Sequence, residues 1–106
     1  MPNEKCIVLI PARMESSRLY GKPMKKIAGI PMIIHVAIRS LQCPIVKRTI
    51  VCTDSATIIY ECEKYGIEVC NTRHNHLNGT DRIAEAAMLL NLSNSEIIVD
   101  VQGDEP

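Results

Sequence analysis

The sequence predicts a single α/β domain with a mainly parallel sheet and helices on both of its faces. Four short apolar runs alternate with segments that have the spacing of amphipathic helices. Strands that alternate with helices are joined by right-handed crossovers, which place helices on both faces of a parallel sheet. A chain of 106 residues has room for one hydrophobic core but not for a separate second domain.

The expected strands are the apolar runs. Residues 6–10 form the first one, which ends at Pro11, and their continuous apolar character is typical of a strand buried on both faces. Residues 48–53 and 97–101 repeat the pattern, and residues 67–70 repeat it more weakly. Ligands bind such sheets beyond the carboxyl ends of the strands, so the segments that follow these runs are the candidate functional regions.

Three helices are expected between these strands. The first begins at Pro31 and stops near Pro44, and the third covers about residues 80–90. The second has a polar N-cap at position 54 or 55 and ends before Gly66, which suits a left-handed C-terminal position. The apolar faces expected on the three helices are Ile34, Ala37, Ile38 and Leu41, then Ile58, Ile59, Cys62 and Tyr65, then Ile83, Ala87 and Leu90.

Composition restricts the class of protein. Twelve basic and twelve acidic residues cancel, which argues against a nucleic-acid binder that works through a large positive field. The five cysteines are an odd number, contain no C-x-x-C pair and lie mostly in apolar runs, so they are expected to be buried thiols. No leader and no apolar run of about 18 residues is visible, and together these features predict a cytoplasmic protein without a membrane span.

A basic loop follows the first expected strand. It contains Arg13, Arg18 and Lys22, which together can neutralise a triphosphate, and Gly21 lets the backbone approach a ligand closely. The loop is neither a G-x-G-x-x-G turn nor a Walker A loop, because Pro23 follows Lys22 where that motif has Ser or Thr. By composition alone, a solvated surface loop is the alternative interpretation.

Three motifs, in order along the chain, resemble the CMP-Kdo synthetases, a family that activates 3-deoxy-manno-octulosonate (Kdo). Residues 11–23 match P-A-R-x-x-S-[ST]-R-L-x-G-K-P, which more loosely resembles other sugar cytidylyltransferases as well. Residues 71–82 are similar to the family's T-R-x-x-H-x-S-G-T-[DE]-R loop, and residues 101–106 are its V-Q-G-D-E-P segment. Tyr20 and Asn78 depart from the family's usual Pro and Ser. The resemblance implies a Rossmann-like three-layer fold of the nucleotide-diphospho-sugar transferase type, here truncated.

The same resemblance assigns roles to individual residues. It implies that Arg13, Lys22 and Asp104 are the catalytic groups, with Asp104 as the ligand of a Mg²⁺ ion. A hard cation that keeps most of its waters suits a carboxylate at a strand end, although an Asp there is on its own more often a turn residue. The residues that the resemblance assigns to CTP are Ala12, Arg13, Arg18, Lys22, Arg73, Asn78, Gly79, Thr80 and Gln102.

The implied reaction is transfer of CMP from CTP to Kdo, which gives CMP-Kdo and pyrophosphate for lipopolysaccharide biosynthesis. The family's chains are much longer, so the resemblance implies that residues 1–106 are the N-terminal CTP-binding part of a single nucleotidyltransferase domain. The sugar-binding and dimerisation part would be absent, and this chain inactive alone. The implied partners are CTP, Kdo and a second copy of the full-length enzyme, with no nucleic acid or membrane.

Two other functions are compatible with the sequence. One is a cytidylyltransferase for a sialic-acid-like sugar, and the other is a non-catalytic nucleotide-binding or assembly module. A zinc site at Cys70, His74 and His76 is disfavoured because no fourth ligand accompanies them.

Overall fold

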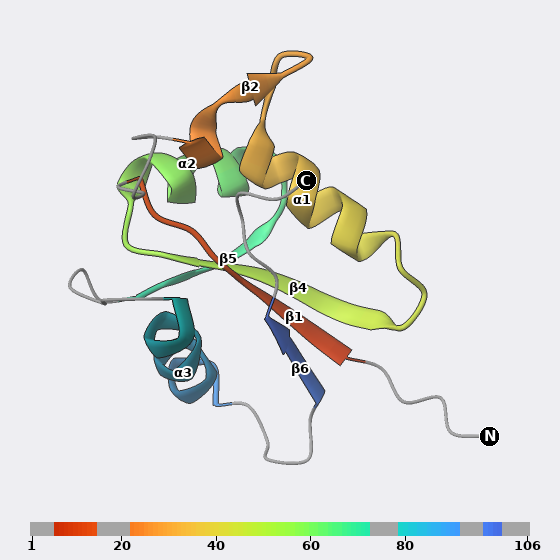
Figure 1. The fold of residues 1–106 in the computed structure, drawn as a ribbon, viewed down its shortest axis with the longest axis vertical. Helices are drawn as coiled ribbons and strands as arrows, with labels where there is room; N and C mark the ends of the chain where they lie inside the picture. The colour runs from red at the N-terminus through yellow and green to blue at the C-terminus, as the bar shows by residue number, and fades with distance from the viewer. Residues whose placement is uncertain (1–5, 15–21, 73–78, 92–96, 101–106) are drawn as a thin grey trace.

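The centre of the molecule is a parallel β-sheet (Figure 1). The structure is a computed structural model that describes residues 6–14, 22–72, 79–91 and 97–100. Within these residues the sheet has the strand order β5-β4-β1-β6, and every neighbouring pair is parallel, which confirms the predicted sheet. The strands are β1 (Cys6–Pro11), β4 (Val46–Thr53), β5 (Glu68–Asn71) and β6 (Ile97–Asp100).

Helices cover both faces of this sheet, as predicted. Figure 1 shows α1 and α2 on one face and α3 on the other. Along β1, Val8 and Ile10 belong to the core under α1 and α2, whereas Ile7 and Leu9 belong to the core under α3. Successive side chains of a strand point to opposite faces, so one apolar run serves both cores. The helices are α1 (Met32–Leu41), α2 (Ala56–Lys64) and α3 (Gly79–Leu89).

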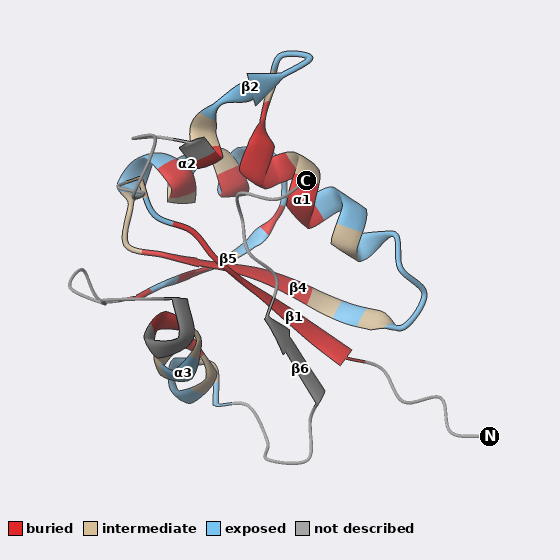
Figure 2. Cartoon of the chain, viewed as in Figure 1, coloured by how far each residue is buried: buried red, intermediate tan, exposed pale blue. Residues whose placement is uncertain are grey.

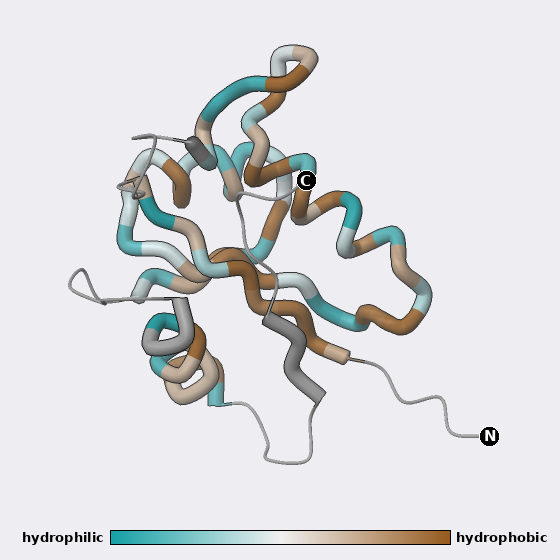
Figure 3. Tube along the Cα trace, viewed as in Figure 1, coloured by the Kyte–Doolittle hydropathy of each residue, from teal (hydrophilic) through white to brown (hydrophobic). Residues whose placement is uncertain are grey.

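Strand β1 is the most completely buried element among those described. All of its residues are buried, and in Figure 2 it is red along its whole length. Figure 3 shows the same path as a band of hydrophobic residues through the middle of the fold. It pairs with β4 on one side and β6 on the other, for example through Val8, which is opposite Thr49 and Val99. The continuous apolar pattern of residues 6–10 is therefore explained by burial on both faces.

The ends of α2 agree with their sequence signals. Ser55 is the N-cap, and its side-chain Oγ accepts a hydrogen bond from the backbone N–H of Ile58 at 3.3 Å. Gly66 has a φ of +74°, the left-handed conformation that glycine adopts without steric cost. The backbone N–H of Ile67 then donates to the carbonyl of Cys62 at 2.8 Å, which completes the helix end.

A small hairpin before α1 was not predicted. It consists of β2 (Lys26–Ile27) and β3 (Ile30–Pro31), and it follows a 3₁₀ turn, η1 (Lys22–Met24). Ala28 and Gly29 connect the strands with φ of 55° and 83°, as in a tight hairpin turn. Strands of two residues are too short to produce an alternating pattern. Because of this hairpin, Pro31 is the N-cap of α1 and not its first helical residue.

Contacts with α1 hold the hairpin in place. His35 Nε2 and the carbonyl oxygen of Ile27 are 2.7 Å apart, and the N–H of Met32 donates to the carbonyl of Lys25 at 2.8 Å. His35 therefore packs against its own chain, as expected of a structural histidine. Figure 1 shows the hairpin projecting beyond the N-terminal end of α1.

Several side chains expected in the core are exposed. Ile38, Leu41 and Tyr65 are 38%, 47% and 36% exposed, because only the first half of α1 packs against the sheet and Tyr65 lies beyond the end of α2. Cys43 is also exposed, which corrects the expectation of five buried thiols. Among the described side chains of α3, Arg82 and Ala86 are buried, whereas Ile83 and Ala87 are only half-buried, as is Leu90 just after the helix.

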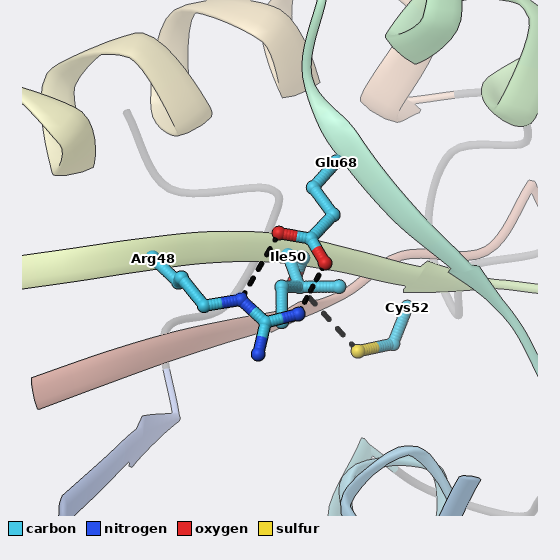
Figure 4. Close-up of polar contacts among 4 residues, drawn as sticks. All are labelled: Arg48, Ile50, Cys52 and Glu68. Atoms are coloured by element: carbon cyan, nitrogen blue, oxygen red, sulfur yellow. Dashed lines mark hydrogen bonds and ion pairs between the residues drawn. The ribbon is translucent and has the colours of Figure 1, made fainter. Parts of the chain in front are cut away.

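The polar half of β4 is tied to β5 by an ion pair (Figure 4). Arg48 Nε donates to Glu68 Oε1 at 3.2 Å, and Arg48 Nη2 donates to Glu68 Oε2. This forked geometry joins two neighbouring strands near the edge of the sheet. Both side chains are partly exposed, so the pair contributes at most about 1 kcal/mol to stability. Figure 4 also shows that the Cys52 thiol faces the carbonyl of Ile50, at 3.7 Å.

Two buried threonines on the same face of β4 are expected to respond oppositely to replacement by valine. The Thr49 hydroxyl is buried and has no hydrogen-bond partner in the described part of the chain, whereas Thr53 Oγ1 accepts the N–H of Ser55 at 3.1 Å. A buried hydroxyl without a partner costs about 1–3 kcal/mol, so Thr49→Val should raise the free energy of unfolding by about 1 kcal/mol. Thr53→Val should lower it by about as much, because it leaves a backbone donor unpaired. Urea unfolding of both variants measures this, and equal destabilisation would contradict the assignment.

Thiol reactivity should distinguish one cysteine from the other four. Burial raises the pKa of the Cys62 thiol to about 11, helped by the nearby carboxylates of Glu61 and Glu63, and burial also raises the pKa of Cys70. The thiolate is the reactive form, so these groups stay protonated and inert near pH 8. One equivalent of a maleimide should label Cys43, and Cys43→Ser should abolish labelling until denaturant is added. Labelling is measured by mass spectrometry. If Cys43→Ser is labelled rapidly under native conditions, another cysteine is reactive and the prediction is wrong.

Candidate functional site

The carboxyl ends of three parallel strands meet at one edge of the sheet. Pro11 at the end of β1 pairs with Cys52, and Thr53 at the end of β4 pairs with Asn71 of β5. The hydrogen-bond ladder continues just beyond the strands, because the N–H of Ala12 donates to the Cys52 carbonyl at 3.0 Å and the N–H of Thr72 donates to the Thr53 carbonyl at 2.9 Å. The residues that follow the three strands are therefore neighbours, at the edge where α/β sheets bind ligands.

Ala12 and Arg13 begin the basic loop at this edge, as the sequence predicted. Ala12 is 5% exposed and packs into the core under α1 and α2, so its main chain is held by both a hydrogen bond and burial. Arg13 is the next residue and is exposed. The guanidinium is thus presented to solvent from a rigidly held backbone, which suits a group that binds an anionic ligand.

Lys22 is placed by its backbone only. It is the first residue of η1, which lies against α1, so the end of the basic loop returns to the helix that covers β1. The loop thus leaves the carboxyl edge at Arg13 and its end is anchored again at η1. Arg18, between these two points, lies outside the described residues.

Gly79 and Thr80 form the first turn of α3. Since α3 follows β5 and packs on β1, β4 and β5, this end of the helix belongs to the carboxyl edge of the sheet. The first turn of a helix has free backbone N–H groups and the positive end of the helix dipole, which favour anions and polar groups. Four further predicted site residues, Arg73, Asn78, Gln102 and Asp104, lie outside the residues that the structure describes.

A buried polar cluster at the same edge was not predicted. The Arg82 side chain is only 3% exposed, and its Nη1 donates to Thr72 Oγ1 at 2.5 Å and lies 3.5 Å from Asp54 Oδ1. Asp54 follows β4, Thr72 follows β5 and Arg82 lies in α3, so three elements meet in one ion-paired group. No sequence signal pointed to it, because the apolar face expected on this helix was Ile83, Ala87 and Leu90, whereas the structure buries Arg82 and Ala86.

The edge as described can recognise a negatively charged, hydrogen-bonding ligand. It combines an exposed arginine, a helix N-terminus and strand ends held in a fixed arrangement. In the described ranges no group of three or more His, Cys, Asp or Glu side chains could hold a metal ion. No helix in those ranges is long and apolar enough to cross a membrane.

Comparisons with known proteins identify the family to which the chain is similar. The family whose description is "Cytidylyltransferase" matches residues 7–106. A 3-deoxy-manno-octulosonate cytidylyltransferase of Verminephrobacter eiseniae is 47% identical over 104 residues, which are 98% of this chain and 38% of the relative. The corresponding protein of Wolinella succinogenes is 47% identical over 100 residues, which are 94% of this chain and 40% of the relative. The chain therefore spans about two fifths of the length of the relatives it matches.

Two solved structures share the fold. A CMP:2-keto-3-deoxy-manno-octonic acid synthetase complexed with CTP superposes with a TM-score of 0.85 at 39% identity, covering 97% of this chain and 42% of that one. A cytidylyltransferase from Leptospira borgpetersenii superposes with a TM-score of 0.74 at 26% identity, covering 95% of this chain and 42% of that one. The arrangement of strands and helices is thus shared with both solved structures.

Proposed function

Since the chain belongs to the cytidylyltransferase family, we propose that it forms the CTP-binding part of an enzyme that transfers CMP from CTP to Kdo. The products are CMP-Kdo and pyrophosphate. The observation that carries this proposal is the likeness, over 97% of the chain, to a synthetase for this sugar acid that is complexed with CTP. The position of Arg13 and of the α3 N-terminus at the carboxyl edge supports a nucleotide site there.

Arg13, Arg18 and Lys22 are proposed to bind the phosphates of CTP. The triphosphate carries several negative charges, and charge-assisted hydrogen bonds from guanidinium and ammonium groups are the strong interactions available to it. When the sugar hydroxyl attacks the α-phosphorus, the bond to the β-phosphate oxygen breaks and pyrophosphate leaves. Positive groups fixed beside that oxygen stabilise the charge that develops on it. The exposed position of Arg13 on a held backbone supports this role.

The nucleoside end of CTP is assigned to the segment before α3. We propose that the Ala12 backbone, Arg73, Asn78, Gly79 and Thr80 contact the cytidine, together with Gln102. Free N–H groups at the start of a helix can satisfy the polar edges of a base or ribose, and α3 begins at Gly79. Hydrogen bonds of this kind discriminate strongly between bases, because a wrong base leaves buried polar groups unpaired.

A Mg²⁺ ion is proposed to accompany the substrate phosphates, with Asp104 as a protein ligand. A carboxylate fits this hard cation, which typically binds one or two protein carboxylates together with phosphate oxygens and water. Such an ion supplies charge neutralisation at the phosphates. Among the described acidic side chains at the carboxyl edge, Asp54 is ion-paired with Arg82. The catalytic groups proposed for this chain are thus Arg13, Lys22 and Asp104.

The biological setting follows from the proposed product. CMP-Kdo is an activated sugar for lipopolysaccharide biosynthesis, and we propose a cytoplasmic enzyme that acts as a homodimer at its full length. Because this chain spans about two fifths of its relatives, the sugar-binding and dimer-forming parts are assigned to the remaining length of such proteins.

Replacing Arg13 should weaken CTP binding. Arg13→Ala removes a charge-assisted hydrogen bond to phosphate worth about 1.5–3 kcal/mol, so the Kd for CTP should rise at least about tenfold. Arg39→Ala is the matched control, because Arg39 is an exposed arginine on the last turn of α1 and its loss changes the net charge equally. Isothermal titration calorimetry of both variants measures the effect. If the two variants have the same Kd for CTP, Arg13 does not bind CTP and the proposal for this residue is wrong.

The sugar specificity is tested by pyrophosphate release from the full-length protein with CTP, Mg²⁺ and a sugar acid. Release is expected with Kdo and not with a sialic acid, and the 106-residue chain alone is expected to bind CTP without turnover. If pyrophosphate is released with the sialic acid but not with Kdo, the sugar substrate is the sialic acid and not Kdo. CTP binding by a full-length protein that turns over neither sugar would instead indicate a nucleotide-binding module.

A further inference from the structure

Two of the buried cysteines are neighbours in the sheet. Cys52 of β4 and Cys70 of β5 are partners in the parallel ladder, one register position before the last pair of the two strands. Partners in a parallel ladder point to the same face of the sheet, and both thiols belong to the core cluster under α3. The other two buried cysteines, Cys6 and Cys62, lie in the opposite core, on a strand and a helix, and are not ladder partners.

The spacing of the two strands fits a disulfide bond between these thiols. Neighbouring strands of a sheet lie about 4.8 Å apart, and the Cα atoms of paired residues in a parallel ladder have nearly this separation. Disulfide bonds bridge Cα atoms that are about 4.4–6.8 Å apart. The Cys52 thiol donates to the carbonyl of Ile50 at 3.7 Å (Figure 4), a weak hydrogen bond whose loss costs little. The backbone therefore already holds Cys52 and Cys70 at the distance that a disulfide requires.

Cys70 is the thiol of the pair that a reagent reaches first. It is 7% exposed and lies on β5, which pairs with β4 alone among the described strands, whereas Cys52 is 0% exposed on an inner strand. A short strand at the edge of a sheet opens locally at a lower free energy than a central strand. Burial raises the pKa of the Cys70 thiol, and the carboxylates of Glu85 and Glu68 raise it further. Because the thiolate is the reactive form, the pair reacts slowly, through openings of β5.

We propose that Cys52 and Cys70 are a redox-sensitive pair, which forms a reversible disulfide bond that locks β5 to β4 near the carboxyl edge of the sheet. In a reducing compartment both residues stay thiols, and the disulfides that form there are usually transient and redox-sensing. The bond lies directly before the residues that end both strands, so the redox state of the pair controls how firmly β5 is held at that edge. The inference goes beyond the proposed function, because neither thiol is assigned to CTP.

The oxidant in this reaction is a small-molecule disulfide. The Cys70 thiol loses its proton, and its sulfur attacks one sulfur of the oxidant, whose S–S bond breaks and releases one thiol. The Cys52 sulfur, after losing its own proton, attacks the Cys70 sulfur of this mixed disulfide and displaces the second thiol. Two electrons and two protons thus pass from the protein to the oxidant, which leaves as two thiol molecules. Excess dithiothreitol reverses both steps.

The deciding experiment oxidises the Cys43→Ser variant, which lacks the exposed thiol, with hydroxyethyl disulfide under native conditions over several hours. This oxidant is small and uncharged, so the neighbouring carboxylates do not repel it. Digestion with trypsin and a glutamate-specific protease separates Cys52 from Cys62, because Glu61 lies between them. Mass spectrometry should then find the peptides of Cys52 and Cys70 linked, with the mass of the protein lower by two hydrogen atoms. Unreacted thiols, a mixed disulfide that persists at Cys70, or a link to Cys62 would each show that the proposal is wrong.

The effect of the bond on the edge of the sheet is measured on the same protein. Oxidised Cys43→Ser should have a Tm at least about 4 °C above that of its reduced form, because the cross-link restricts the unfolded chain. The amides of β5 should also exchange with solvent more slowly. Adding Cys70→Ala should abolish both changes, whereas adding Cys62→Ala, the matched control, should preserve them. If the Cys70→Ala variant does not fold, the oxidised and reduced forms of Cys43→Ser still decide, and a linked protein with no rise in Tm would refute the lock.

Discussion

The burial of β1 between two helical layers is the constraint on which the rest of the structure depends. Its side chains alternate between the core under α1 and α2 and the core under α3, and its backbone pairs with β4 and β6. No polar side chain can occupy such a strand without losing its water, so the run from Cys6 to Ile10 is entirely apolar. Both cores contain side chains of this one strand, so the helices on the two faces of the sheet all pack against it or its neighbours.

The positions of the residues at the carboxyl edge of the sheet depend on the burial of β1. Because β1 and β4 are held in register, the residue after each strand is placed within the same hydrogen-bond ladder. Ala12 is buried, and this fixes the point from which Arg13 projects into solvent. Arg13 thus extends from a held backbone, which is the arrangement that lets a charged side chain bind a phosphate without a large entropic cost.

Polar groups inside the fold are concentrated where the strands end. Thr53, Asp54, Thr72 and Arg82 lie at the carboxyl edge, and three of them form one ion-paired cluster. Farther along the sheet, the pair of Arg48 and Glu68 is partly exposed and can keep some water (Figure 4). The difference in burial is the physical reason to assign the two clusters different roles: the exposed pair adds a little stability, and the buried one fixes a geometry.

Much of this protein follows from its sequence alone. The apolar run of residues 6–10, the N-cap at Ser55 and the left-handed Gly66 are local signals, and local chemistry is sufficient to produce the strand and both helix ends. The hairpin at Ala28 and Gly29 escaped prediction because its strands are too short for a periodic pattern. The family also follows from local motifs, which lie in order along the chain and match a cytidylyltransferase family over residues 7–106.

Only the tertiary structure decided which side chains lie inside and which polar groups meet. Periodicity placed Ile38 and Leu41 in the core, but the sheet supports only the first half of α1 and leaves them exposed. Conversely, Arg82 was not among the residues expected in the core, and it is buried because the ends of β4 and β5 supply Asp54 and Thr72 as partners. Burial of a charge depends on partners that are distant in sequence, and a sequence pattern has no record of where those partners come together.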